Sequence, residues 1–144
     1  MGYPSEEHER QLLLSHDGRP DASSDVEVDA VLGVEEIEGL RSRVAQVHTD
    51  PGLAEYVLGI VRRTRDRRDV LLGGSPRAGL MLLHASRARA LLRGRDYTLP
   101  DDVRALARAV LAHRILLTPE AEMDSVRAED VVDEALAAVP YAHA

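Results

Sequence analysis

The sequence predicts an all-α fold, a helical bundle with at most one very short β-hairpin. Three observations lead to this prediction. Hydrophobic residues make up 44% of the 144 residues, which is enough to bury a core. Phe, Trp and Cys are absent, so that core must consist of Leu, Val, Ile and Ala. Along several segments apolar side chains recur every three or four residues, the period of a helix, and no long segment alternates as a half-buried strand does.

The N-terminal third of the chain predicts two helices with a polar segment between them. Pro4-Ser5-Glu6-Glu7 opens a short helix that runs through Leu14. Residues 17–25 are polar and rich in helix-breaking residues, so they indicate a loop or linker. A second helix is expected from about Val34 to Val47. Its apolar stripe is Ile37, Leu40, Val44 and Val47.

Three further helices are expected to begin with a proline, which is favoured in the first turn. Asp50-Pro51 starts a third helix, and its arginine-rich end over 62–68 suits the negative C-terminal end of a helix dipole. A fourth helix covers 76–92 and is ended by Gly94, and Pro100 opens a fifth. The apolar face expected for the fourth helix is Ala78, Met81, Leu82, Ala85, Ala88 and Leu92.

The C-terminal part of the chain predicts one more helix and a small strand. The helix is expected from about Ala128 to Val139. Residues 115–117 form a short apolar run, predicted to be a strand paired with residues near Tyr97 or Val126. The centres of the apolar stripes should be buried together in one core. These centres are Val57, Ile60, Leu82, Leu106, Val110 and Leu136.

The composition excludes several classes of chemistry. All 18 basic residues are arginine, and without lysine the chain has neither a GxxxxGK[ST] phosphate loop nor a Schiff-base lysine. Without cysteine it has no disulfide, no thiolate metal site and no cysteine nucleophile. No apolar run is long enough to span a membrane, and the N-terminus lacks the plan of a signal peptide. We therefore expect a soluble, cytoplasmic protein that does not contact a membrane.

Charge is distributed unevenly along the chain. Residues 1–50 contain 12 acidic residues and 4 arginines, and residues 101–144 contain 9 acidic residues and 4 arginines. Residues 51–100 reverse this balance, with 4 acidic residues and 10 arginines. This basic middle indicates either an anionic partner or a set of helix faces whose arginines pair with acids of the flanking helices.

The segment Gly73-Gly74-Ser75-Pro76-Arg77 is the candidate functional site. Ser75 is suited to cap a helix whose first residue is Pro76, which places Arg77 in the opening turn. An arginine there offers five donors in a planar fork, a geometry that suits phosphate oxygens. The alternative is a capped helix with an ordinary surface arginine. The local sequence leaves both interpretations open.

Other residue types that could carry chemistry favour structural roles. Asp101-Asp102 lie in a first helical turn, where acids interact with the helix dipole. His113, near a helix C-terminus, is expected to be a cap or dipole partner. No serine has a histidine base implied by its spacing. The other histidines are scattered without helical partners, so no metal site is expected at His8, His16, His48, His84 or His143.

Several short motifs occur in a fixed order, and together they resemble a known family. They are Gly2-Tyr3-Pro4-Ser5 with Glu9, Thr64-Arg65, Gly73-Gly74-Ser75-Pro76-Arg77-Ala78, Ala88, Gly94-Arg95-Asp96-Tyr97, Pro100-Asp101-Asp102-Val103 and His113-Arg114. The ordered set resembles the C-terminal part of a MoxR-type AAA+ ATPase, a group related to the magnesium-chelatase ATPase subunits. The resemblance covers nearly the whole chain. The Walker A, Walker B and sensor 1 segments of the family precede the part that this chain matches.

The resemblance implies a role for the candidate site. In this family the matching portion forms a helical lid that folds over a nucleotide held by an α/β base domain. The arginine of the family's SPR motif is sensor 2, which reaches the γ-phosphate, and Arg77 matches it, with Ser75 and Pro76 as motif support. The parent protein would thus bind ATP or ADP with Mg²⁺. Its expected partners are the base domain, neighbouring subunits of a ring and a von Willebrand A-type protein.

The resemblance also implies how the chain is divided. Residues 1–15 are expected to be a remnant of the ATPase base, 16–33 a linker loop, and 34–144 the helical lid. Such a lid is expected to bind nucleotide weakly if at all and to hydrolyse none by itself. Two positions depart from the family pattern at helix caps, where this chain has Leu99, and Ser125 followed by Arg127.

Two other functions stay open at this stage. One is a small helical module that binds nucleic acid through the arginines of the third and fourth helices. The acidic net charge of −7 and the scarcity of aromatic residues, at 3%, argue against it. The other is a free-standing adaptor lid that acts on a separate ATPase, and the sequence does not distinguish it from a piece of a longer ATPase.

Overall fold

The computed structural model describes residues 4–15 and 29–141. The chain divides between Gly33 and Val34 into two compact units. In the first unit, α1 covers Glu6–Ser15, and Arg10 pairs with Glu6 one turn earlier at 3.1 Å. The short helix expected through Leu14 is therefore present. The loop expected over 17–25 lies outside the described residues.

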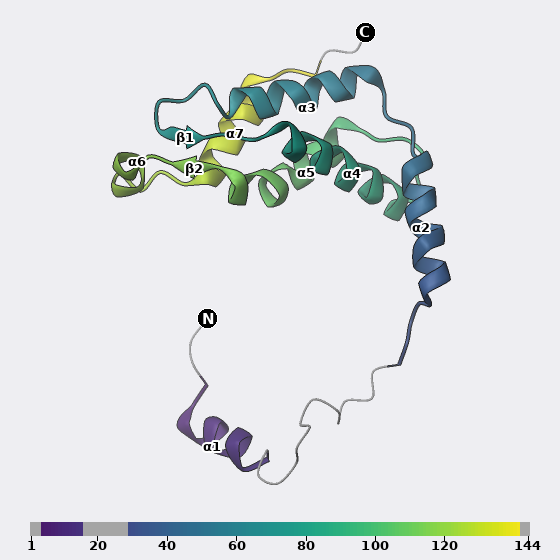
Figure 1. Cartoon of the computed structure of the whole chain (residues 1–144), viewed down its shortest axis with the longest axis vertical. Helices are drawn as coiled ribbons and strands as arrows, with labels where there is room; N and C mark the ends of the chain where they lie inside the picture. The colour runs from purple at the N-terminus through teal and green to yellow at the C-terminus, as the bar shows by residue number, and fades with distance from the viewer. Residues whose placement is uncertain (1–3, 16–28, 142–144) are drawn as a thin grey trace. The chain divides into compact units, whose positions relative to one another are not determined.

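The second unit contains the remaining helices and one small sheet (Figure 1). Its helices are α2 (Val34–Gln46), α3 (Pro51–Arg63), α4 (Pro76–Leu92), α5 (Pro100–Leu111), the 3-10 turn η1 (Ala112–Arg114), α6 (Pro119–Met123) and α7 (Ala128–Ala138). The strands are β1 (Val70–Leu72) and β2 (Leu116–Leu117). The prediction of an all-α bundle with one very short β-pairing is confirmed.

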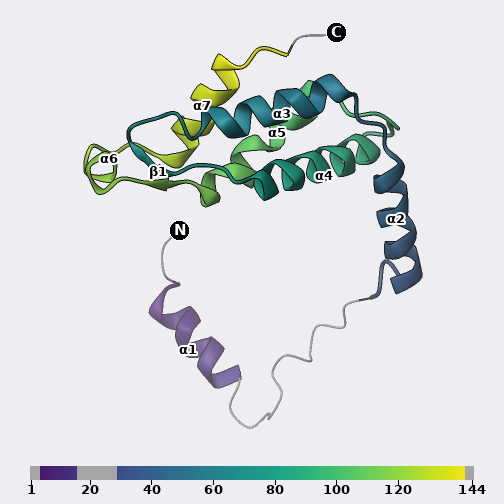
Figure 2. The same cartoon turned by 45° about the horizontal axis from the view of Figure 1, so that its top comes forward.

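The helices of the second unit are arranged around α3, α4 and α5. Figures 1 and 2 both show these three helices running alongside one another, with α7 crossing behind α3 and packing against α5. The β1–β2 ribbon and α6 lie at one end of the bundle, and α2 lies at the other, against α4. The start of α4 is therefore close to the end of the bundle that carries the ribbon.

The core lies where α3, α4, α5 and α7 meet. Leu53, Ile60, Leu82, Leu111 and Val132 are fully buried there. Three of the six predicted core centres, Val57, Ile60 and Leu82, are in this cluster. The other three are only partly buried and pack against its edge: Leu106, Val110 and Leu136.

The buried faces of α4 and α5 agree with the predicted ones only in part. On α5 the buried row is Val103, Ala107 and Leu111, one position away from the predicted centres. On α4, Met81 and Leu92 are 48% and 87% exposed. The buried row of α4 runs instead through small residues: Ala78, Gly79, Leu82, Ser86 and Ala90. Because α4 is apolar on more than one face, the period alone did not select the face that contacts α3 and α5.

The predicted stripe of α2 and the predicted strand partner also need correction. Of the four stripe residues of α2, only Val47 is buried, because α2 contacts the bundle at the end of α4. The strand at 116–117 is present, but its antiparallel partner is β1, with Val70 opposite Leu117. Tyr97 instead forms an isolated bridge with His48, and the Val126 N–H bonds back to α6. A three-residue strand has too little alternation to be recognised from sequence.

The ends of several helices follow the expected capping chemistry. The Asp50 carboxylate accepts the Gly52 N–H at 2.7 Å at the start of α3. At the end of α4, Gly94 adopts φ 74°, which glycine tolerates without strain. The N–H groups of Gly94 and Arg95 then bond to Leu91 O and Ala90 O at 2.9 and 3.0 Å. This Schellman pattern is the reason why α4 stops where predicted.

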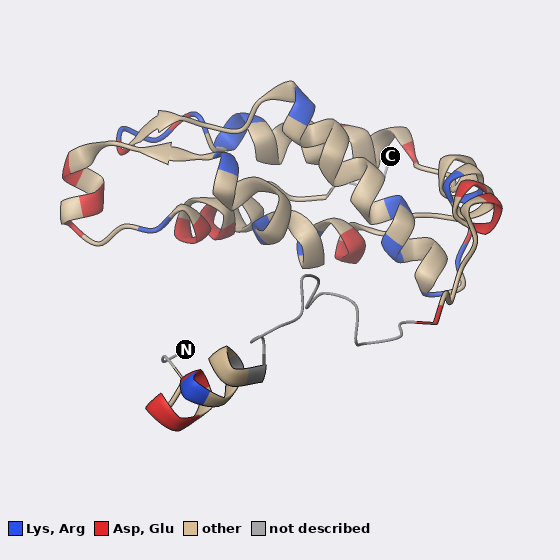
Figure 3. Cartoon of the chain, turned by 60° about the horizontal axis from the view of Figure 1, so that its bottom comes forward, with Lys and Arg blue, Asp and Glu red and all other residues tan. Residues whose placement is uncertain are grey.

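Arginines of the basic middle reach acidic side chains on other helices of the second unit. Arg63 and Arg67 both contact Glu134 of α7. Arg89 of α4, and Arg95 in the segment that follows α4, contact Asp102 of α5. Figure 3 shows the arginines and the acids interspersed over these helices. For these residues the structure supports the second interpretation of the basic middle, pairing with acids of flanking helices.

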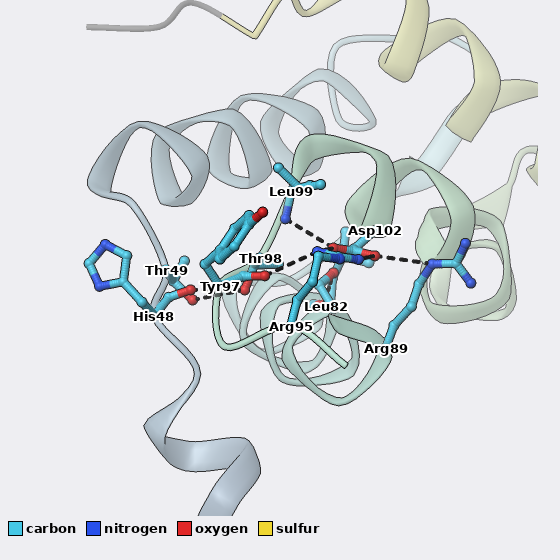
Figure 4. A network of polar contacts seen from close by, with 10 residues as sticks. His48, Thr49, Leu82, Arg89, Arg95, Tyr97, Thr98, Leu99 and Asp102 are labelled. Carbon is cyan, nitrogen blue, oxygen red and sulfur yellow. Dashed lines mark hydrogen bonds and ion pairs between the residues drawn. The ribbon is translucent and has the colours of Figure 1, made fainter. Parts of the chain in front are cut away.

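Asp102 joins the end of α4 to the start of α5 (Figure 4). It is 2% exposed, and its carboxylate receives two hydrogen bonds from Arg95, at 2.8 and 2.9 Å. It also accepts the Leu99 N–H at 2.9 Å, and Arg89 Nε lies 3.3 Å away as an ion pair. Burial alone would raise the pKa of Asp102, but the bonds from Arg95 and Leu99 outweigh it and hold that pKa below its ordinary value.

This network predicts an acid-sensitive contribution to stability. Because the folded pKa of Asp102 is lowered, its contribution is complete above the ordinary value of about 3.9 and is lost as the pH falls through the folded pKa. At pH 7, Asp102→Asn should lower the free energy of unfolding by about 1–3 kcal/mol, because the arginines lose a charged acceptor. The difference in the free energy of unfolding between Asp102→Asn and the wild type should become smaller in acid. Urea unfolding at pH 7 and at an acidic pH measures this difference.

The matched control for this prediction is Asp101→Asn. Asp101 precedes Asp102 in the same helical turn, but its side chain is 83% exposed. A change there should be nearly neutral, as exposed substitutions usually are. Equal free energies of unfolding for the two variants at pH 7 would show that the buried network does not stabilise the fold.

Candidate functional site

The start of α4 places Arg77 at the surface. Ser75 has extended backbone angles, and its Oγ accepts the Ala78 N–H at 3.3 Å, so it caps the helix as the sequence predicted. Pro76 is the first helical residue and Arg77 the second. The Arg77 side chain is exposed.

Thr64 fixes the loop that leads into this helix. Its hydroxyl is completely buried and donates to Val61 O at 2.7 Å, at the end of α3. The same oxygen accepts the Gly74 N–H at 2.9 Å. Arg65 adds a second bond, from its Nε to Gly74 O at 2.8 Å. Both backbone groups of Gly74 are therefore held against the C-terminus of α3. The position of the α4 start follows from these bonds.

The two glycines allow this close approach. A Cβ at Gly73 would lie 2.8 Å from Thr64 O, a backbone atom that cannot move aside. A Cβ at Gly74 would lie 3.3 Å from both Thr64 Oγ1 and Val61 Cγ1, closer than most real contacts. A side chain at Gly73 would force the loop away from α3 and would shift the start of α4. The Gly-Gly pair is therefore part of the device that positions Arg77.

Arg77 has no structural partner that explains its place. Among the described residues, its guanidinium has no hydrogen bond and no ion pair. The first turn of α4 contains no acidic residue. A cation near a helix N-terminus faces the positive end of the dipole, an unfavourable arrangement of about 0.3–1 kcal/mol. Arg77 therefore does not stabilise α4, and its side chain is free to meet an anion.

Arg114 is a second arginine at this site; the sequence marked it only as part of the His113-Arg114 motif and did not predict that it lies near Arg77. It lies on η1, between α5 and β2, and is half-buried. Arg77 and Arg114 line one surface depression together with Leu80, Met81 and His84. No motif spacing could predict this, because the two arginines come from helices far apart in the sequence. His113 beside it is exposed, and no side-chain bond to a helix end is found for it in the part of the chain that the structure describes.

The described residues do not assemble a site for the other kinds of chemistry considered from the sequence. Within residues 4–15 and 29–141, no three His, Asp or Glu side chains are grouped so that they could hold a metal ion. His16 and His143 lie outside these residues. None of the described helices is both long and apolar enough to cross a membrane.

Comparison with known proteins decides the family. The family model of the AAA lid domain matches residues 62–135, about half of the chain. The chain belongs to the AAA lid domain family. The match begins in the last turn of α3 and includes the Thr64–Gly74 bond, α4 with Arg77, and most of α7.

Relatives of this AAA lid domain include proteins that carry the MoxR name. It is 39% identical to YeaC of Bacillus subtilis over 96% of this chain, and 32% identical to Chaperone MoxR1 of Mycobacterium tuberculosis, also over 96%. It is 34% identical to Protein MoxR of Methylorubrum extorquens over 78% of the chain. The recognition of a MoxR-type AAA lid is confirmed.

The fold is shared with a larger protein. A crystal structure from Cytophaga hutchinsonii, described as a candidate ATPase, matches 99% of this chain with a TM-score of 0.78 and 23% identity. The match covers 45% of that protein, and the chain spans 42% and 38% of YeaC and MoxR1. This chain therefore spans about two fifths of the length of these relatives.

Proposed function

We propose that this domain is the nucleotide-responsive lid of a MoxR-type AAA+ ATPase, with Arg77 as its sensor 2 residue. The observation that carries the proposal is an exposed, unpaired arginine held at a defined place by the Thr64–Gly74 bond. An unpaired guanidinium on a fixed helix start is suited to bind phosphate oxygens.

The residues present fit only the phosphate end of a nucleotide. The chain has no lysine to bridge the β- and γ-phosphates. Among the described residues, the depression beside Arg77 is lined by no carboxylate that could bind Mg²⁺. In the parent protein, ATP and Mg²⁺ would therefore be held by the base domain, and Arg77 would add positive charge. By itself the lid would hydrolyse no ATP.

Arg77 would act on charge that increases during phosphoryl transfer. Donors that are already oriented toward the equatorial oxygens of the transferred phosphoryl group stabilise the transition state without reorganising. The bonds of Thr64 and Arg65 to Gly74 keep the α4 start in place for this task. Movement of the lid as a body would bring Arg77 to the phosphate, and loss of the γ-phosphate would remove its partner.

The wider roles implied by the family belong to the same proposal. Contact with a base domain and with neighbouring ring subunits agrees with membership of the AAA lid family. A von Willebrand A-type partner and a cytoplasmic location stay predictions, as does the assignment of residues 1–15 to the ATPase base and 16–33 to a linker. Binding of nucleic acid is disfavoured, because Arg63, Arg67, Arg89 and Arg95 are engaged by acidic side chains.

The experiment that tests the proposal is steady-state ATP hydrolysis by the parent ATPase and its Arg77→Ala variant. We expect a strong loss of turnover in a protein that remains folded. The magnitude of this loss and its controls are considered in the Discussion.

A further inference from the structure

Arg114 differs from the other half-buried arginines of the described residues. Each of the others contacts an acidic side chain or a hydroxyl: Arg63, Arg67, Arg87, Arg89 and Arg95. Within the described residues, Arg114 has neither a hydrogen bond nor an ion pair. Its Nε is completely shielded from solvent without an acceptor.

This arrangement is unfavourable for the lid without a ligand. A buried donor that lacks an acceptor loses its bond to water and gains nothing in return. The rest of the half-buried Arg114 guanidinium also lacks a partner among the described residues, and it is this part that is available to an anion.

The surroundings of Arg114 also favour an anion as the ligand. It lines the depression that contains Arg77 and His84. It also lines a second depression, beside Arg65 and the loop over 73–76 that leads into α4. Among the described residues, no acidic side chain lines either depression. The positive end of the α4 helix dipole adds to the potential there.

We propose that Arg114 and Arg77 form a two-arginine binding site for an oligophosphate chain. The inference rests on the proposed role of Arg77 and extends it to a residue on another element, since Arg114 follows α5 while Arg77 begins α4. Two guanidinium groups contact more than one phosphate oxygen, so the site favours a chain of phosphates over a single small anion. The bound chain would bridge the start of α4 and the end of α5.

The test uses this chain and inorganic tripolyphosphate at constant ionic strength. Amide chemical shifts of Ser75, Arg77 and Ala78, and of residues next to Arg114, should change saturably during the titration. Arg114→Gln and Arg77→Gln should each raise the dissociation constant for tripolyphosphate about tenfold or more, the loss of affinity typical of a charged hydrogen bond. The matched control is Arg68→Gln, because Arg68 is exposed and lies in neither depression. It should change binding less than twofold. Thermal melting checks that each variant is folded.

The outcomes separate this inference from the proposed function. An Arg114→Gln variant that binds tripolyphosphate as tightly as the wild type overturns the two-arginine site, even if Arg77→Gln weakens binding. Lack of saturable binding by the wild type, or an equal loss in Arg68→Gln, also overturns it. If both arginines are required for binding but the Arg77→Ala parent keeps full ATP turnover, the anion site stands and the sensor role fails.

Discussion

Arg77→Ala in the parent ATPase is expected to lower the turnover number by about 10²–10³-fold, the loss measured when one preorganised donor is removed from an active site. The lid itself should remain folded, because the Arg77 side chain is exposed and makes no bond within the described residues. Arg77→Lys should recover only part of the rate, because an ammonium group cannot reproduce the planar fork of donors.

The measurement is steady-state ATP hydrolysis at saturating ATP, with thermal melting to check folding. Arg68→Ala is the matched control, since it also removes one exposed arginine of the same domain. It should leave turnover within a small factor of the wild type. Wild-type turnover in the Arg77→Ala variant would reduce Arg77 to an ordinary surface residue.

Leu82→Ala is expected to give a large loss of stability, about 2–5 kcal/mol in the free energy of unfolding. Leu82 is completely buried on α4, in the cluster formed with α3 and α5. Truncation removes apolar contacts and leaves a cavity that the surrounding helices can fill only partly. Such a loss is a considerable fraction of the total stability of a domain of this size, typically about 5–15 kcal/mol.

The neighbouring residue provides the control. Met81 precedes Leu82 in the same helix but is 48% exposed. Met81→Ala should cost less than about 0.5 kcal/mol, as surface changes usually do. Urea unfolding of the two variants measures the difference. Similar losses in both would mean that α4 presents a different face to the core. Leu106, which the sequence predicted to be a core centre, is not the residue chosen for this test, because its side chain lies at the edge of the core.

Helix starts were the part of the fold that the sequence specified best. Asp50-Pro51 and Ser75-Pro76 each combine a side-chain cap with a proline in the first turn, and both helices begin as expected. At Leu99 and Arg127, where the family's caps are missing, the third helical residue accepts the N–H of the cap residue instead. These acceptors are the carboxylates of Asp102 and Asp130. The helices therefore begin without a hydroxyl cap.

Tertiary contacts could not be predicted in the same way. The buried face of α4 consists of small residues, and its apolar side chains do not select one side. The strand β1 has only three residues, so its pairing with β2 follows from the approach of distant segments rather than from a local pattern. The short helix α6 was not predicted, although Thr118-Pro119 combines a side-chain cap with a proline as the starts of α3 and α4 do.

The candidate site shows the same division between local and distant information. Ser75, Pro76 and Arg77 were placed correctly, because cap and proline chemistry act within one turn. The bond from Gly74 to Thr64 and the presence of Arg114 depend on contacts between elements that are separated in the sequence. Thr64-Arg65 and His113-Arg114 were recognised as family motifs, but their physical roles required the fold.

The most direct test of the central claim is a crystal structure of the parent ATPase with a non-hydrolysable ATP analogue and Mg²⁺. We predict that a guanidinium nitrogen of Arg77 lies about 2.7–2.9 Å from a γ-phosphate oxygen, the usual length of a charged hydrogen bond. The bond between the Gly74 N–H and the Thr64 hydroxyl should keep its length of 2.9 Å. An Arg77 side chain that stays in solvent, or that pairs with a carboxylate while the nucleotide is bound, would contradict the claim.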